Sequence, residues 1–74
     1  MKVLDFKKSL KEIVEEYPEV VDIMEELGFS EIVKPGMINT VGRVMTIPKG
    51  ALMRGIDLEK IKETFKAKGF EINE

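Results

Sequence analysis

Residues 17–29 read YPEVVDIMEELGF, and residues 57–70 read DLEKIKETFKAKGF. Each stretch opens with a residue typical of a helix start, carries apolar side chains at helical spacing, and ends in Gly-Phe. A glycine in this position favours the left-handed conformation that closes a helix, and the apolar residue after it packs back onto the last turn. The two stretches therefore predict two helices with the same ending, in which Phe29 and Phe70 are structural and Phe70 contacts Phe65.

The remaining helix signals are a capping box and a proline in a first turn. Ser9-Leu10-Lys11-Glu12 has the spacing in which a serine hydroxyl and a glutamate three residues later cap each other's amides. Thr46-Ile47-Pro48 opens another helix, with proline where a missing N–H does no harm. The expected helices are Leu10–Tyr17, Pro18–Leu27, a short central one near Met37–Arg43, Ile47–Arg54 and Leu58–Lys68.

These signals predict an all-α fold, a compact orthogonal array of four main helices plus one short central helix. The length of 74 residues favours a single helical domain over residues 1–74. No alternating run is long enough to indicate a sheet. Residues 1–8 are expected to fold back on the core, and residues 71–72 to trail off in an extended conformation. The expected core is Leu10, Ile13, Val14, Val20, Ile23, Met24, Leu27, Phe29, Val41, Val44, Ile47, Leu52, Ile56, Leu58, Ile61, Phe65 and Phe70.

The composition excludes several kinds of site. The chain has no Cys and no His, which rules out a disulfide, a thiolate-held cluster and a Ser-His or Cys-His nucleophile pair within it. The usual zinc and haem ligands are missing as well. We therefore expect no enzyme activity, no metal site and no cofactor.

The charges are distributed unevenly along the chain. The net charge is -2, yet residues 32–56 contain no Asp or Glu and hold two lysines and two arginines. Three glycines in this block would let backbone approach a ligand closely. The residues expected to contact a partner or an anion are Lys34, Asn39, Thr40, Arg43, Thr46, Lys49 and Arg54.

Three interpretations of this basic block stay open. It could dock a protein partner, with Arg43 and Arg54 as anchors, because arginine is favoured at binding hot spots. It could bind a small anionic metabolite at the loop around Asn39–Lys49, since amides at a helix start favour anions. It could also only neutralise the acidic first helices. Met37, Met45 and Met53, spaced by eight residues, fit either the core or an adaptable partner surface.

Charge, aromatic content and hydropathy also predict the kind of partner and the cellular location. With a net negative charge, one Tyr and no basic stripe, nucleic-acid binding is not expected. No apolar stretch is long enough to span a membrane, so a cytoplasmic protein is expected. No heptad seam demands a partner helix, so we expect a monomer.

The order of short motifs resembles a known family. Tyr17-Pro18-Glu19-Val20 is followed by Leu27-Gly28-Phe29, by NTVGR at 39–43, by TIPKG at 46–50, by GID at 55–57 and by GFEI at 69–72. This pattern is similar to a small all-helical domain family of unknown function. That family resembles the N-terminal domain of ScdA-type iron–sulfur cluster repair proteins and the hybrid-cluster-associated redox-disulfide domain. The resemblance implies a five-helix accessory or sensing module. The redox relatives carry cysteines after the glycine that ends the second helix, where this chain has Phe29, Ser30, Glu31 and Ile32.

Overall fold

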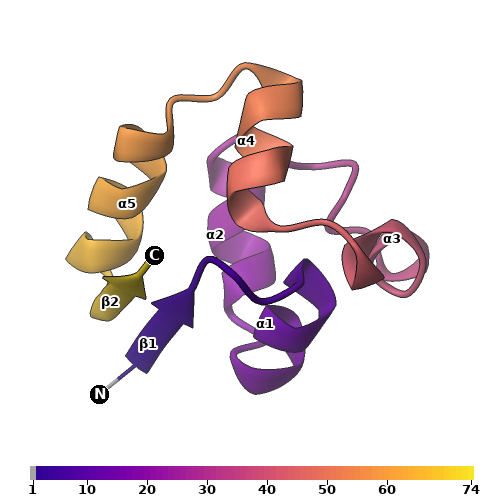
Figure 1. The fold of residues 1–74 in the computed structure, drawn as a ribbon, viewed down its shortest axis with the longest axis horizontal. Coiled ribbons are helices and arrows are strands. Elements are labelled where there is room, and N and C mark those ends of the chain that lie inside the picture. Colours follow the sequence, from indigo (N-terminus) through magenta and orange to yellow (C-terminus); the bar gives the residue numbers. More distant parts are fainter. Residues whose placement is uncertain (1) are drawn as a thin grey trace.

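The chain folds into helices closed at one side by a short sheet (Figure 1). The computed structural model describes residues 2–74, so Met1, the first residue of the expected domain, lies outside the described residues. The elements are β1 (Lys2–Asp5), α1 (Leu10–Glu16), α2 (Val20–Glu26), α3 (Pro35–Ile38), the 3-10 turn η1 (Val41–Arg43), α4 (Ile47–Arg54), α5 (Leu58–Ala67) and β2 (Phe70–Asn73). Four main helices and a short central one agree with the expected mostly helical fold.

The sheet is the part of the fold that the sequence did not predict. β1 and β2 pair in parallel, with Lys2 opposite Phe70 and Asp5 opposite Asn73, and they lie side by side near both ends of the chain in Figure 1. The pairing continues past β1, because the amide of Phe6 donates to the carbonyl of Asn73 at 2.9 Å. Four-residue strands are too short to show a clear alternation, and a parallel partner gives no local turn signal.

Phe70 joins the sheet to the helices. Its ring meets the ring of Tyr17 edge-on at 5.3 Å and the ring of Phe65 edge-on at 5.5 Å, the geometry that aromatic quadrupoles favour. The hydroxyl of Tyr17 accepts from the amide of Val3 at 3.2 Å. The predicted contact between Phe70 and Phe65 is confirmed, and the same ring also anchors the end of α1.

The helix ends follow the predicted cap chemistry. Ser9 and Glu12 form the reciprocal capping box of α1. After α2, the amide of Phe29 donates to the carbonyl of Met24 at 2.9 Å and Gly28 adopts a φ of 105°, which together make a Schellman ending. The boundaries of α4 agree with the prediction, because both its start and its stop are local signals.

The other helix boundaries differ by small amounts. α1, α2 and α5 each end one residue earlier than predicted, and α2 begins at Val20 because Pro18 lies in the preceding turn. The expected helix over Met37–Arg43 is two pieces, α3 and η1, separated by a turn. A proline at the first position of α3 explains its earlier start.

Most of the predicted core is buried in one cluster, but two members were wrong. Val44 is 73% exposed and Leu52 is 85% exposed. α4 instead turns Ile47, Gly50 and Ala51 inward. The buried hydrophobic residues are Leu4, Phe6, Leu10, Ile13, Val20, Ile23, Met24, Phe29, Val33, Ile38, Met45, Ile47, Ala51, Ile61, Phe65 and Phe70.

The close approach of α4 to the core explains why Leu52 points outward. A Cβ added to Gly50 would lie 3.4 Å from Phe29 Cε1 and 3.4 Å from Ile32 Cδ1, so only a very small side chain fits there. Positions 47, 50 and 51 share one face of a helix at i, i+3 and i+4 spacing. With that face turned inward, Leu52 and Met53 come to lie on the solvent side.

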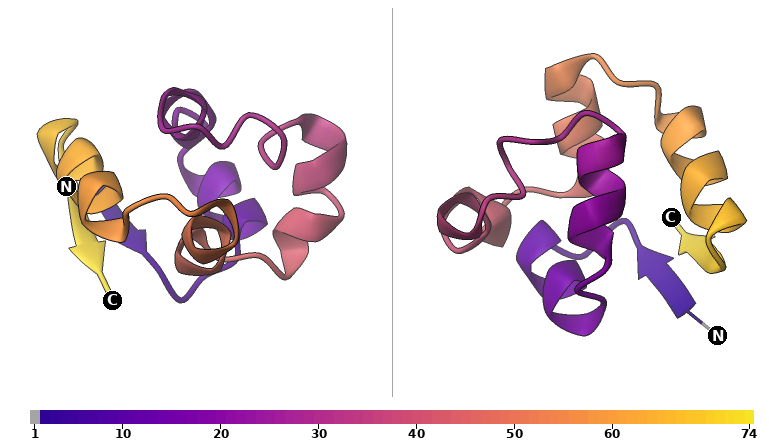
Figure 2. Two further views of the ribbon diagram at one scale, coloured as in Figure 1. Left: turned by 90° about the horizontal axis from the view of Figure 1, so that it is seen from above. Right: turned by 180° about the vertical axis from the view of Figure 1, so that it is seen from behind.

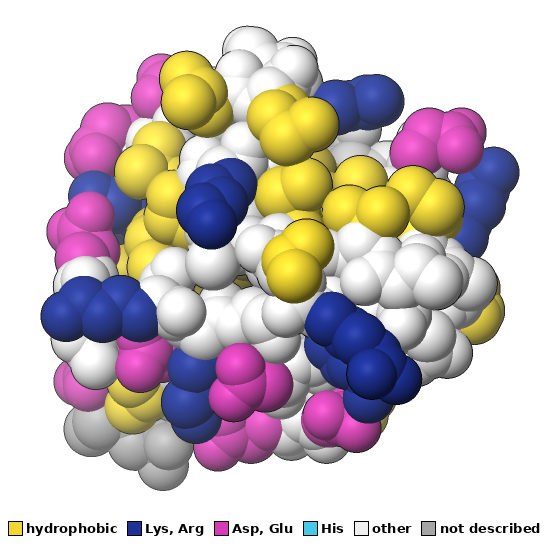
Figure 3. Space-filling model, turned by 45° about the vertical axis from the view of Figure 1, so that its right-hand side comes forward, with side chains coloured by type: hydrophobic (Ala, Val, Ile, Leu, Met, Phe, Trp, Pro, Cys, Tyr) yellow, Lys and Arg dark blue, Asp and Glu magenta, His cyan; other side chains and the backbone are white. Residues whose placement is uncertain are grey.

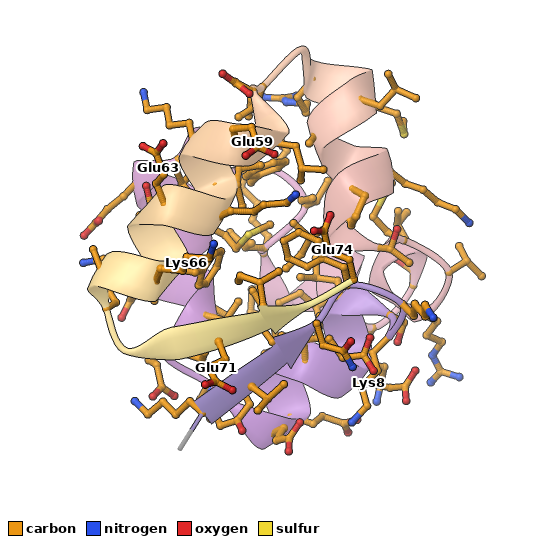
Figure 4. The ribbon with its side chains drawn as sticks, turned by 60° about the vertical axis from the view of Figure 1, so that its left-hand side comes forward. Lys8, Glu59, Glu63, Lys66, Glu71 and Glu74 are labelled. Atoms are coloured by element: carbon orange, nitrogen blue, oxygen red, sulfur yellow. The ribbon has the colours of Figure 1, made fainter. Side chains whose placement is uncertain are left out.

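One lysine ties α5 to the end of β2. Lys62 Nζ lies 2.7 Å from Glu74 Oε1 and 3.0 Å from Glu59 Oε2, and Figure 4 shows these two glutamates on α5 and at the end of β2. The hydrogen bond that the Lys62 ammonium donates to Glu74, and next the one that it donates to Glu59, raise the pKa of Lys62 above its ordinary value. At the other strand, a hydrogen bond from Lys2 lowers the pKa of Glu19.

Candidate functional site

The seven residues predicted to contact a partner or an anion lie on three segments. Lys34 precedes α3, Asn39 and Thr40 follow it, and Arg43 ends η1. Thr46 and Lys49 stand at the start of α4 and Arg54 at its end. The structure does not gather them around one hollow, because only Lys34 and Asn39 line the groove described below.

Several polar groups of the predicted loop are used inside the fold. Thr40 Oγ1 donates to the carbonyl of Gly36 at 2.8 Å, and Arg43 Nε donates to the carbonyl of Asn39 at 2.8 Å. Thr46 Oγ1 accepts from the amide of Lys49 at 3.3 Å as the cap of α4. These bonds hold the turn between α3 and α4 in shape and leave the loop fewer donors for an anion than the sequence suggested.

The outer side of α4 carries an exposed surface of mixed character, which we call the α4 face and define as Lys49, Leu52 and Met53. Arg54, which ends the helix, is at i+7 from Ile47 and does not share this side. Leu52 is 85% exposed and Met53 is 73% exposed. Lys49, Leu52 and Met53 follow the i, i+3, i+4 spacing of one helix side. On the side of the molecule shown in Figure 3, apolar and basic side chains lie together over its upper middle, and acidic ones lie mainly toward its margins.

Most basic residues of this region make no contact ion pair within the described part of the chain. Within residues 2–74, no acidic side chain forms an ion pair with Arg43, Lys49 or Arg54. Lys34 is paired, but with Glu31 three residues before it. At these three positions the interpretation of the block as an internal counter-charge has no contact ion pair to support it, and it stays a prediction. Of the three regular methionines, Met45 is buried and Met53 is exposed.

A groove lies between α1, α2 and the segment that leads into α3. Its volume is about 430 Å³, and Figure 2 (right) shows from behind how these three elements are arranged. The lining is mainly apolar, with charged side chains from α1, α2 and the start of α3. The lining residues are Lys11, Val14, Glu15, Val21, Glu25, Val33, Lys34, Pro35, Ile38 and Asn39.

Sequence reasoning missed this groove because its walls come from three segments. Val14 was predicted as core and is only half-buried, and Val21 is half-buried too. The valine at position 21, next to buried Val20, was the available signal, because side chains of consecutive residues leave a helix about 100° apart and can face different neighbours.

Two further properties concern metals and membranes. The residues that the structure describes contain no group of three or more His, Cys, Asp or Glu side chains placed to hold a metal ion. Among the same residues, every helix is too short or too polar to cross a bilayer.

Comparison with known proteins places the chain in a family. The family model described as "Domain of unknown function (DUF1858)" matches residues 4–62. A crystal structure of a conserved domain protein from Streptococcus pneumoniae TIGR4 is similar at 36% identity, with a TM-score of 0.91 over 97% of this chain and 91% of that chain. None of the curated proteins is similar enough to count as a match. The likeness to the ScdA-type domain stays a prediction. This chain belongs to the family of the DUF1858 domain of unknown function.

Proposed function

We propose that this domain is a non-catalytic interaction module that docks an acidic protein surface through the α4 face. The observation that carries the proposal is the exposure of Leu52 and Met53 on the same helix side as Lys49, a basic residue that makes no ion pair within residues 2–74. Burying a leucine side chain is worth about 1.5–3 kcal/mol. A partner that covers Leu52 would gain that free energy.

Charge complementarity favours an acidic partner. The block of residues 32–56 holds no acid, and opposite charge on a partner would speed encounter and fix orientation. Lys49 is the expected charged contact, because it lies on the same side of α4 as Leu52 and Met53, whereas Arg54 at the end of the helix does not. Arg43 contributes less than the sequence suggested, since its Nε is held by the carbonyl of Asn39.

The first test identifies the partner by position-specific cross-linking. A photo-reactive residue is placed at position 52, or at exposed Glu71 on β2 (Figure 4), in cells that naturally produce the protein. We expect a defined adduct from position 52 and none from position 71. The same adducts from both positions, or none from position 52, would reject docking through α4.

The second test uses the purified partner. Leu52→Ser should weaken binding by about 10-fold or more, which corresponds to the burial of one leucine. Val3→Ser on β1 is the matched control, because Val3 is also apolar and exposed but lies on another element. Lys49→Glu should weaken binding and flatten its dependence on salt. Unchanged affinity in both α4 variants would contradict the proposal.

A further inference from the structure

The groove between α1, α2 and α3 has the size and lining of a small-molecule site. Its volume of about 430 Å³ falls within the usual range of roughly 300–1,000 Å³ for such sites. Val33 and Ile38 on its floor are 2% and 8% exposed, so the floor is continuous with the hydrophobic core. Val14, Val21 and Pro35 extend this apolar surface outward.

The rim of the groove offers charges of both signs. Lys11 and Glu15 are joined at 3.1 Å and satisfy each other. Glu25 has no ion pair within residues 2–74. Lys34 has only a long contact with Glu31, at 3.4 Å, in which both side chains are at least 60% exposed. Such a solvated pair contributes little and is readily exchanged for another carboxylate.

We propose that this groove binds a free α-amino acid with a branched or aromatic apolar side chain. The side chain packs on Val14, Val21 and Ile38. The ammonium group lies against the carboxylate of Glu25, and the carboxylate of the ligand lies against the ammonium of Lys34. The side-chain amide of Asn39, which also lines the groove, has both a donor and an acceptor for either end.

Charge complementarity selects this class over simpler ligands. A carboxylic acid without an amine would bring its charge next to Glu25, and an amine without a carboxylate would bring its charge next to Lys34. A zwitterion satisfies both residues and adds no net charge to the groove. Glycine has both charged groups but no side chain to pack on the apolar floor. The affinity for a larger amino acid therefore comes from burial of its apolar side chain.

Amide chemical-shift titration of the whole labelled domain tests the proposal. The probes are L-leucine and L-phenylalanine, with 4-methylpentanoate, isoamylamine and glycine as partial analogues. We expect saturable shifts at groove residues with a Kd below about 1 mM for the two amino acids, and at least about 10-fold weaker binding of each analogue. Absence of saturable shifts, or equal binding of 4-methylpentanoate or isoamylamine, would overturn it.

Two variants test the charged contacts at the rim, and a third serves as their control. Glu25→Gln and Lys34→Gln should each weaken leucine binding about 10-fold or more, because each removes one charged partner. Glu26→Gln, the neighbouring position on α2 that pairs with Lys68 and not with the groove, should bind leucine like the wild type. Equal effects of all three variants would overturn the assignment. The analogue series on the wild-type domain decides the matter even if a variant fails to fold.

Discussion

Replacing Leu4 by alanine should destabilise the domain strongly, although the residue lies in a strand that the sequence did not reveal. Leu4 is 0% exposed and belongs to the hydrophobic cluster. The substitution removes about three buried carbon groups at roughly 0.8 kcal/mol each, and the residual cavity adds to that loss. We expect the free energy of unfolding to fall by about 3 kcal/mol, out of a total of roughly 4–11 kcal/mol for a chain of this length.

Urea denaturation followed by circular dichroism measures this change, and thermal unfolding checks it. A loss of about 3 kcal/mol should lower Tm by roughly 12–24 °C for a domain of this size. Val3→Ala is the matched control, because Val3 is the adjacent residue of β1 and its side chain is 38% exposed. Its effect should stay below about 1 kcal/mol. If Leu4→Ala costs no more than Val3→Ala, the burial of β1 against the helices is refuted.

Three further changes test the helix ends and the lysine beneath β2. Gly28→Ala should lower the free energy of unfolding by about 1–2 kcal/mol, because Gly28 has a φ of 105°. Gly36→Ala in α3 is the control and should cause no loss, because an added Cβ there meets nothing within 4 Å. Equal losses of stability in urea denaturation would contradict this. Ser9→Ala should cost about 1 kcal/mol through the lost cap, and a Ser9→Thr variant that does not retain most of that stability would speak against the cap as the cause. The pKa of Lys62 is raised in the folded state. Its contribution to stability is therefore complete below the pKa of lysine in the unfolded chain, about 10.4, and is lost as the pH rises through the pKa of Lys62 in the folded state. Glu74→Gln should therefore lower the Lys62 pKa in an NMR titration and make the loss of stability above about pH 10 less steep; an unchanged pKa would show that Glu74 is not its cause.

Features set by neighbouring residues could be predicted from the sequence. The boundaries of α4 depend on the Thr46 cap and the Gly55 stop, which lie within a few residues of the helix. The Schellman ending of α2 is likewise complete within residues 24–29. Such signals need no knowledge of how the helices pack, because both partners of each hydrogen bond belong to the same short stretch.

Features set by packing could not be predicted. α4 offers apolar residues on more than one side, and the side that turns inward is decided by the close approach of Gly50 to Phe29. For that reason Leu52, the larger side chain, ended on the surface. The candidate sites share this dependence. The sequence singled out Lys34 and Asn39 by charge and polarity, but the groove that they line exists only once α1, α2 and α3 are placed together.

The pairing of β1 with β2 has a consequence for the order in which the domain is completed during synthesis. β1 emerges from the ribosome before its partner, which spans residues 70–73, so the sheet cannot close until residue 73 has left the exit tunnel. The endings of α1 and α2 are local and can form well before that moment. Until the strand at residue 70 arrives, Leu4 and Phe65 lack the surface that covers them. An expression fragment cut at residue 62, where the family match ends, would lack Phe65 and the whole of β2, so Leu4 would remain without its cover.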